Sequence, residues 1–292
     1  MGTSSLIDAG RTSPLRAPLE LIAETDAHEG PVYAADEHAL YFTTVRRGTV
    51  AIKRLELADG SLSVVRADAN TANGMALDLE GRLVVCEQGT LRESARITRL
   101  NRESREVETL VDSWNGLPLN SPNDVVVKSD GTIWFTDPSY GYLQGFRPKP
   151  QIGDHVYRYN PVSDSMTLVA DGFDKPNGLS FSPDERVLYV GDNGAPHELI
   201  AFDVEAGSLL SGRRVVAVSS GEHPDGIKVD SEGRIYASAP RGVQVLAPTG
   251  ELVGEIELPG AVIFAFGGPE GNVLYITTDT AIWAVVLNAK GA

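Results

Sequence analysis

Five residues with oxygen-bearing side chains recur along the sequence, each directly before an apolar segment that resembles a β-strand. They are Glu29, Asn73, Asn123, Asn177 and Asp225. Carboxylate and amide oxygens are hard ligands that suit Ca²⁺, Mg²⁺ or Mn²⁺, and the set contains neither His nor Cys. If the fold brought these side chains together, two carboxylates would neutralise one divalent cation. Amide oxygens and water would then complete its coordination.

The elements that must position these residues are β-hairpins, of which the central one is the clearest. Val125–Val127 and Thr132–Thr136 are rich in β-branched and aromatic residues, and an Asp-Gly turn separates them. In an antiparallel pair, the start of one strand lies beside the end of its partner. We therefore expect Asn123 and Asp124, before the first strand, to lie close to Asp137 at the end of the second.

The same hairpin recurs six times along the chain, at intervals of roughly 40–50 residues. Its copies begin at Glu29, Asn73, Asn123, Asn177, Asp225 and, in a degenerate form, Ile263. Further pairs of alternating apolar segments lie between the copies, so each unit has the content of a four-stranded sheet. Six such units predict an all-β fold, a six-bladed β-propeller. The residues that open the hairpins should then converge on the central axis and form a metal site there.

Asn-Gly and Asp-Gly are also common turn dipeptides, which is the alternative interpretation of these positions. However, they stand before the strands, whereas the turns between strands are already supplied by residues 130–131 and 232–233. Glu29 is a poor turn former and occupies the same position in its repeat. The sequence therefore favours a convergent site.

One propeller accounts for almost the whole chain. The last unit has a strand at residues 282–287 but lacks a fourth strand, which residues 19–24 could supply and so close the ring. We expect a flexible N-terminal segment at residues 1–17 and a single propeller domain at residues 18–292.

The composition excludes several classes of partner. With 25 Lys and Arg against 40 Asp and Glu, the net charge of −15 disfavours nucleic acid and anionic membrane surfaces. No segment reaches the ~18 apolar residues of a membrane span, and residues 1–17 lack the apolar core of a secretory signal. Cys86 is the single cysteine, so no intrachain disulfide forms. We expect a cytoplasmic protein, a monomer or a homodimer, that binds neither nucleic acid nor membranes.

The motifs around these positions resemble the SMP-30, gluconolactonase and luciferin-regenerating enzyme family of six-bladed propellers, over roughly residues 20–288. The matching motifs are His28-Glu-Gly-Pro-Val-Tyr33, Ser121-Pro-Asn-Asp124, Trp134-Phe-Thr-Asp-Pro-Ser-Tyr-Gly141, Lys175-Pro-Asn-Gly178 and His223-Pro-Asp-Gly226. Residues 141–150 are especially similar to a segment of the microbial gluconolactonases. The resemblance implies one catalytic divalent cation held by Glu29, Asn123, Asn177 and Asp225.

The activity that the resemblance implies is that of a lactonase, a hydrolase that opens a sugar lactone with metal-activated water. Asp225 is our candidate for the general base, with His223 as an alternative base, and Glu29 is the second residue expected to be catalytic. Ca²⁺ is the preferred cation, with Mg²⁺, Mn²⁺ and Zn²⁺ as alternatives. The physiological ion and the lactone are left open.

Other residues near these motifs are expected to contact the substrate or to support the ligands. The expected substrate contacts are Asn73, Trp114, Ser121, Asp124, Tyr140 and His223. The expected supporting residues are His28, Asp137 and Asp192. Residues 140–150 are predicted to form a loop that partly covers the pocket, with a packed surface excursion or an oligomer contact as alternatives. Ser121 stands where some animal members of the family place a sugar-binding arginine, so the preferred sugar is left open.

Two other functions fit the same sequence. One is a hydrolase of other lactones or of organophosphate-type esters at the same metal, which an apolar pocket mouth would favour. The other is a non-catalytic propeller that binds Ca²⁺ for rigidity, because a fold does not determine a function. The presence of both acids, Glu29 and Asp225, favours an enzyme.

Overall fold

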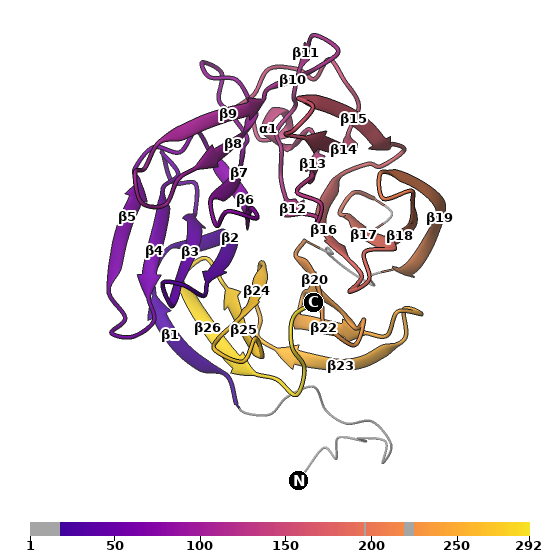
Figure 1. Ribbon diagram of the computed structural model, residues 1–292. Coiled ribbons are helices and arrows are strands. Elements are labelled where there is room, and N and C mark those ends of the chain that lie inside the picture. The colour runs from indigo at the N-terminus through magenta and orange to yellow at the C-terminus, as the bar shows by residue number, and fades with distance from the viewer. Residues whose placement is uncertain (1–17, 196, 219–224) are drawn as a thin grey trace.

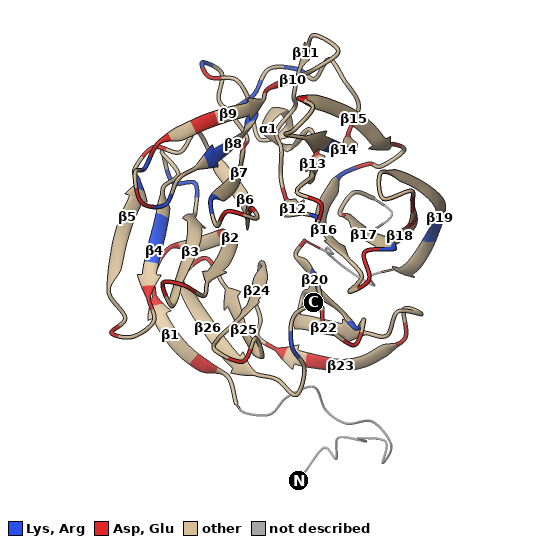
Figure 2. Ribbon diagram, viewed as in Figure 1, with Lys and Arg blue, Asp and Glu red and all other residues tan. Residues whose placement is uncertain are grey.

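Six four-stranded antiparallel sheets surround a central axis in the computed structural model, which describes residues 18–195, 197–218 and 225–292 (Figure 1). Within each sheet the strands pair in the order in which they leave the axis, so the first strand of each unit is innermost. The predicted six-bladed β-propeller is therefore confirmed. Basic and acidic residues are interspersed around the whole ring (Figure 2).

The first three sheets have the following strands: β2 (Ala27–Ala34), β3 (Ala39–Thr44), β4 (Ile52–Glu56) and β5 (Leu62–Arg66); β6 (Ala72–Leu77), β7 (Leu83–Glu87), β8 (Arg96–Leu100) and β9 (Val107–Val111); β12 (Val125–Val127), β13 (Ile133–Asp137), β14 (His155–Asn160) and β15 (Ser165–Ala170).

The other three sheets have the following strands: β16 (Pro176–Phe181), β17 (Val187–Asp192), β18 (Glu198–Glu205) and β19 (Leu209–Val218); β20 (Ile227–Val229), β21 (Ile235–Ala239), β22 (Gly242–Leu246) and β23 (Leu252–Glu257); β24 (Phe264–Gly267), β25 (Val273–Thr277), β26 (Ala281–Val286) and β1 (Glu20–Glu24).

The ring is closed by a strand from the beginning of the described chain. β1 pairs antiparallel with β26, with Glu20 opposite Ala284 and Glu24 opposite Ala281. The outer edge of the sixth sheet is thus covered by β1, as the sequence predicted for residues 19–24. Joining the two ends of the chain in one sheet ties the first blade to the last.

Two short elements lie outside the six sheets. β10 (Ser113–Trp114) and β11 (Leu117–Pro118) form a small hairpin before the third blade, and α1 (Tyr140–Leu143) is a single helical turn after β13. This helix falls within the segment predicted as a loop. No helix in the described residues has the length and apolar character needed to cross a bilayer.

The core consists of apolar layers between neighbouring blades. Successive residues of β13 point to opposite sides: Trp134 packs with Leu179 and Val190 of the fourth blade, whereas Phe135 packs with Val84 and Ile97 of the second. Since both faces of this strand are covered, all five of its residues are buried. This explains why the second strands of the hairpins read as continuous apolar segments rather than as alternating ones.

Substitutions on the two faces of β1 test its role in closure. Ile22 packs into the layer between the last and first blades, whereas Leu21 is 47% exposed. We expect Ile22→Asp to lower the free energy of unfolding by about 2–3 kcal/mol, because it forces a charge against apolar neighbours. Leu21→Asp should change it by less than about 0.5 kcal/mol. Urea unfolding of the two variants measures both values, and equal effects would contradict an anchoring role for β1.

Candidate active site

The residues that open the inner strands line a cavity of about 240 Å³ at one end of the central channel. The structure brings together all five polar residues identified from the repeat, with two of the other predicted residues, His28 and Tyr140. The full lining is His28, Glu29, Thr44, Arg46, Val50, Thr71, Ala72, Asn73, Gln88, Asn123, Tyr140, Gln144, Asn177, Asn193 and Asp225.

The glycine after an axial residue allows adjacent blades to approach closely. The amide of Gly74 donates to the carbonyl oxygen of Asn123 over 2.8 Å, and a Cβ on Gly74 would lie 2.6 Å from that oxygen. A Cβ on Gly178 would lie 2.1 Å from the carbonyl oxygen of Asp225. The Asn-Gly dipeptides at these positions therefore serve contact between blades and not a turn, which decides between the two interpretations left by the sequence.

Hydroxyl groups at the ends of the second strands fix the backbone of the axial residues. Thr43 donates to the carbonyl of Asn73 over 3.1 Å, and Thr136 donates to that of Asn177 over 2.8 Å. Thr277 donates to the carbonyl of residue 28 over 2.6 Å. Each bond joins one blade to the next, and all three threonines are fully buried. These threonines were not identified from the sequence, although a threonine recurs at the end of the aromatic and apolar second strands.

Negative charge is concentrated at the cavity. Glu29 is 4% exposed, and its burial raises its pKa well above the ordinary range. The charges of Asp225 and Asp124 raise the pKa of Glu29 further, while the ammonium of Lys228 opposes them. A buried carboxyl among other acids is a costly arrangement unless positive charge compensates it.

The side chains present suit a hard cation. The Oδ1 atom of Asn123 is buried and has no hydrogen-bond partner, which normally costs about 1–3 kcal/mol. Asn177 donates from Nδ2 to the hydroxyl of Tyr140 over 3.4 Å. This hydrogen bond uses the NH₂ end of the amide, so the Oδ1 atom is the end that could bind a cation. Within the described residues, no group of three or more His, Cys, Asp or Glu side chains is arranged to hold a metal. A cation here would depend on two carboxylates together with amide oxygens.

The two predicted supporting aspartates have the same role in adjacent blades. The carboxylate of Asp137 accepts from the backbone amides of Asn120 and Ser121, at 2.9 and 2.8 Å. That of Asp192 accepts from the amides of Asp174 and Lys175, at 2.9 and 2.7 Å. Each aspartate therefore fixes the segment that leads into an axial asparagine. His28 differs: its Nδ1 lies 2.6 Å from Oδ1 of residue 279.

Three residues predicted to contact substrate do not line the cavity. Ser121 is fully buried and its hydroxyl bonds the backbone of residues 138 and 141. Asp124 is 2% exposed and accepts from the amide of Leu179. Trp114 packs against Tyr157 and lines a separate depression. Their local sequence gave no sign of these long-range contacts. His223 lies outside the described residues.

The segment from residue 140 to 150 covers one side of the cavity and is firmly anchored. Tyr140 and Gln144 reach the cavity, and the guanidinium of Arg46 stacks over Phe146 at 4.3 Å from the ring centroid. Arg147 is buried and donates to four backbone carbonyls, those of residues 90, 93, 119 and 120. Arg46 and Gln144 were not identified from the sequence, because no motif marks them.

Comparison with known proteins identifies the family of the chain. Residues 27–280 match the SMP-30/Gluconolactonase/LRE-like region, which is most of the chain. The chain belongs to this family. The predicted resemblance is thereby confirmed.

Members of the family share both the sequence and the fold. A gluconolactonase from Zymomonas mobilis is 29% identical over 90% of this chain and 79% of its own length. A solved gluconolactonase from Xanthomonas campestris is 34% identical, with a TM-score of 0.85 over 97% of this chain and 93% of that one. A calcium-binding regucalcin from Agrobacterium tumefaciens is 18% identical, with a TM-score of 0.77 over 96% of both chains, and shows a shared fold only.

Thr136 offers a test of how the axial backbone is held. Its hydroxyl donates to the carbonyl of Asn177 and accepts from the amide of Asp124 over 3.1 Å. Thr136→Val keeps the shape but leaves both buried groups unpaired, so we expect the free energy of unfolding to fall by about 2–4 kcal/mol. Thr136→Ser retains the hydroxyl and should lose less than half as much. If urea unfolding gives equal losses for both variants, the hydrogen bonds do not carry this stability.

Asp137 makes the stability depend on pH. Burial raises the pKa of Asp137 from 3.8 to about 7 in the folded protein. Its stabilising contribution is therefore complete below about pH 4 and is lost as the pH rises through about 7. The asparagine of Asp137→Asn does not titrate. Its effect on the free energy of unfolding is therefore the same at every pH, and any pH dependence of the difference between the two proteins comes from Asp137. We expect the stability advantage of the wild type over Asp137→Asn, measured by urea unfolding, to shrink between about pH 4 and 7.5. An advantage independent of pH would contradict this assignment.

Proposed function

We propose that this protein is a lactonase that hydrolyses a sugar lactone and depends on one divalent cation. The observation that carries the proposal is the convergence of Glu29, Asp225 and the unpartnered amide oxygen of Asn123 on one cavity. The predicted reaction class, hydrolysis of a lactone ester bond by an enzyme, is confirmed by the family and by the relatives named gluconolactonase.

We assign the cation to Glu29, Asn123, Asn177 and Asp225. Two carboxylates balance a divalent charge, and the amide oxygens add neutral ligands, which is the donor chemistry that Ca²⁺ accepts. We therefore take Ca²⁺ as the preferred ion, on this donor set alone. Mg²⁺, Mn²⁺ and Zn²⁺ are alternatives for the experiment below.

When bound, such a cation would polarise the lactone carbonyl and lower the pKa of water. Of the two acids, Asp225 is the more exposed and Glu29 is buried, so Asp225 is better placed to take a proton from the attacking water. The backbone amide of Asp225 donates to the hydroxyl of Ser238 over 2.9 Å, which holds this acid at the end of the channel.

The other polar residues are suited to hold the substrate. Asn73 is fixed at the wall because its Nδ2 donates to the carbonyl of Asn123 over 3.2 Å. Burial and the charge of Asp225 raise the pKa of Tyr140, so its phenol stays protonated and available as a hydrogen-bond donor. Both groups match the hydroxyls of a sugar ring.

The wall chemistry distinguishes between the candidate substrates. Apart from Val50, Ala72 and the ring of Tyr140, every residue that lines the cavity is polar. An apolar cavity entrance would favour hydrophobic lactones or organophosphate-type esters, but the residues that line this cavity are mostly polar. The cavity therefore favours a polyhydroxylated lactone.

A pH-stat assay with D-glucono-1,5-lactone tests the proposal, after spontaneous hydrolysis is subtracted. We expect Asp225→Asn and Glu29→Gln each to lower kcat/KM at least about 100-fold, since each removes a charged group from the reacting centre. Asp59→Asn removes a fully exposed carboxylate and should behave as the wild type. Chelation should abolish activity, and one of Ca²⁺, Mg²⁺, Mn²⁺ or Zn²⁺ should restore it.

Two results would contradict the proposal. An acid variant that hydrolyses lactone at the wild-type rate would show that the site is misassigned. Full activity after exhaustive chelation would show that the hydrolysis needs no cation.

A further inference from the structure

A partly buried ion pair lies in the central channel below the candidate active site, with the aspartate buried and the lysine side chain 23% exposed. Asp124 comes from the start of the third blade, and its Oδ2 lies 3.8 Å from the Nζ of Lys228 on β20 of the fifth blade. The carboxylate also accepts from the backbone amides of Val125 and Leu179, at 2.9 and 3.3 Å. Asp124 is thus bonded to its own blade and the fourth, and lies beside the ammonium of the fifth.

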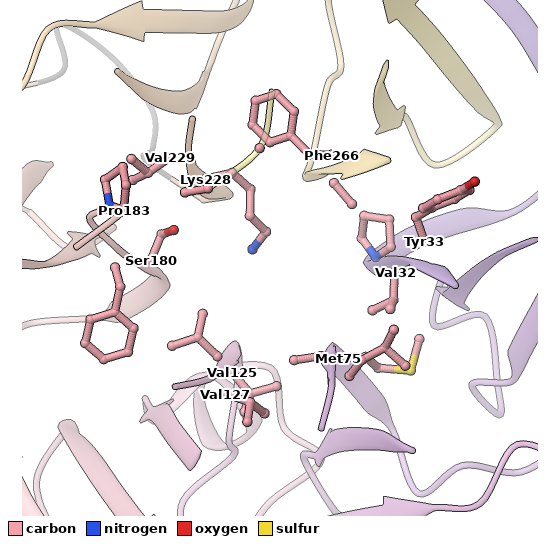
Figure 3. A pocket seen from close by; sticks show the side chains of 18 of the residues that line it. Val32, Tyr33, Met75, Val125, Val127, Ser180, Pro183, Lys228, Val229 and Phe266 are labelled. Carbon is pink, nitrogen blue, oxygen red and sulfur yellow. The ribbon is translucent and has the colours of Figure 1, made fainter. Parts of the chain in front are cut away.

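Lys228 reaches this position from the opposite end of the channel. Its side chain extends into a cavity of about 480 Å³ with mainly apolar walls, among them Met75, Val127 and Phe266 (Figure 3). Glu185 also lines this cavity and is already paired with Lys128 over 3.0 Å.

The ammonium of Lys228 therefore lies 3.8 Å from Asp124, at the edge of a cavity lined mostly by apolar side chains. The Nζ to Oδ2 separation is longer than a hydrogen bond, so the two groups interact through the attraction of opposite charges and not through a directional hydrogen bond. Apolar walls strengthen such a coupling because they screen it less than water does.

Lys228 contributes one positive charge to the acidic centre of the channel. Three carboxylates, those of Glu29, Asp124 and Asp225, lie nearest one another: the charges of Asp225 and Asp124 raise the pKa of Glu29, and the more distant charge of residue 279 adds the smallest effect. A divalent cation at the cavity compensates two of them. Lys228 compensates the third, and its charge acts on Glu29 with the opposite sign to the two aspartates.

We propose that Lys228 is a positioning residue that neutralises Asp124 and thereby adjusts the charge of the active site to one divalent cation. This inference rests on the proposed function. The negative charge of Asp124 increases the affinity of the active site for a cation, and the positive charge of Lys228 reduces this effect.

Calorimetric titration with Mn²⁺ near pH 8, on the full chain after chelation, tests the proposal. Lys228→Met removes the ammonium but keeps an apolar chain of similar length. We expect it to bind Mn²⁺ at least about tenfold more tightly than the wild type, because the third carboxylate is left uncompensated. Asp124→Asn should bind at least about tenfold more weakly. The double variant should return to within about threefold of the wild type.

Two further variants serve as controls. Lys228→Arg keeps the charge and should keep the wild-type affinity. Lys149→Met removes an exposed charge from the loop and should change nothing. General damage to the fold weakens metal binding, so tighter binding by Lys228→Met separates the proposed role from a merely structural one.

Equal or weaker binding by Lys228→Met would overturn the inference even if the wild type binds Mn²⁺ and hydrolyses lactone. A wild-type protein that binds no divalent cation would instead overturn the metal-dependent function on which the inference rests. The two failures are therefore distinguishable.

Discussion

The burial of several carboxylates around one axis is the constraint on which this structure depends. Glu29 and Asp124 are almost fully buried, and Asp225 faces the same cavity as Glu29. Burial and the neighbouring negative charges raise the pKa of Glu29, and such an arrangement weakens the fold unless positive charge is supplied. Lys228 supplies one such charge from within the chain. The carboxylate and amide oxygens at the cavity suit a divalent cation. The acidic groups that would destabilise the propeller without positive charge are thus the same groups that we assign to the hydrolytic site.

The propeller makes this arrangement possible by repeating the same local structure at the start of its inner strands. Five of the six inner strands are preceded or opened by a polar residue, and glycine after it at Gly74 and Gly178 lets the next blade approach to contact distance. A buried hydroxyl, as in Thr136, then bonds the neighbouring backbone and fixes the direction of the axial residue. Five side chains from separate parts of the sequence thus meet at one cavity, although no two are close in the chain.

The sequence was sufficient for the parts of the structure that repeat. The period and the strand pattern predicted the six blades and the closing strand β1, and the register of the repeat predicted which residues face the axis. What it missed depends on contacts between distant segments. Trp114 packs on Tyr157 instead of lining the cavity, and Asp124 meets Lys228 two blades away. Arg46 at the cavity was not predicted either, because no local sequence pattern shows that it stacks on Phe146.

The most direct test of the central claim is anomalous diffraction from crystals of the full chain grown with Mn²⁺ after other metals are removed. We expect one strong peak in the cavity, at about 2.1–2.6 Å from carboxylate oxygens of Glu29 and Asp225 and from the Oδ1 atoms of Asn123 and Asn177. A cavity without a peak, or a metal bound elsewhere on the chain, would contradict it.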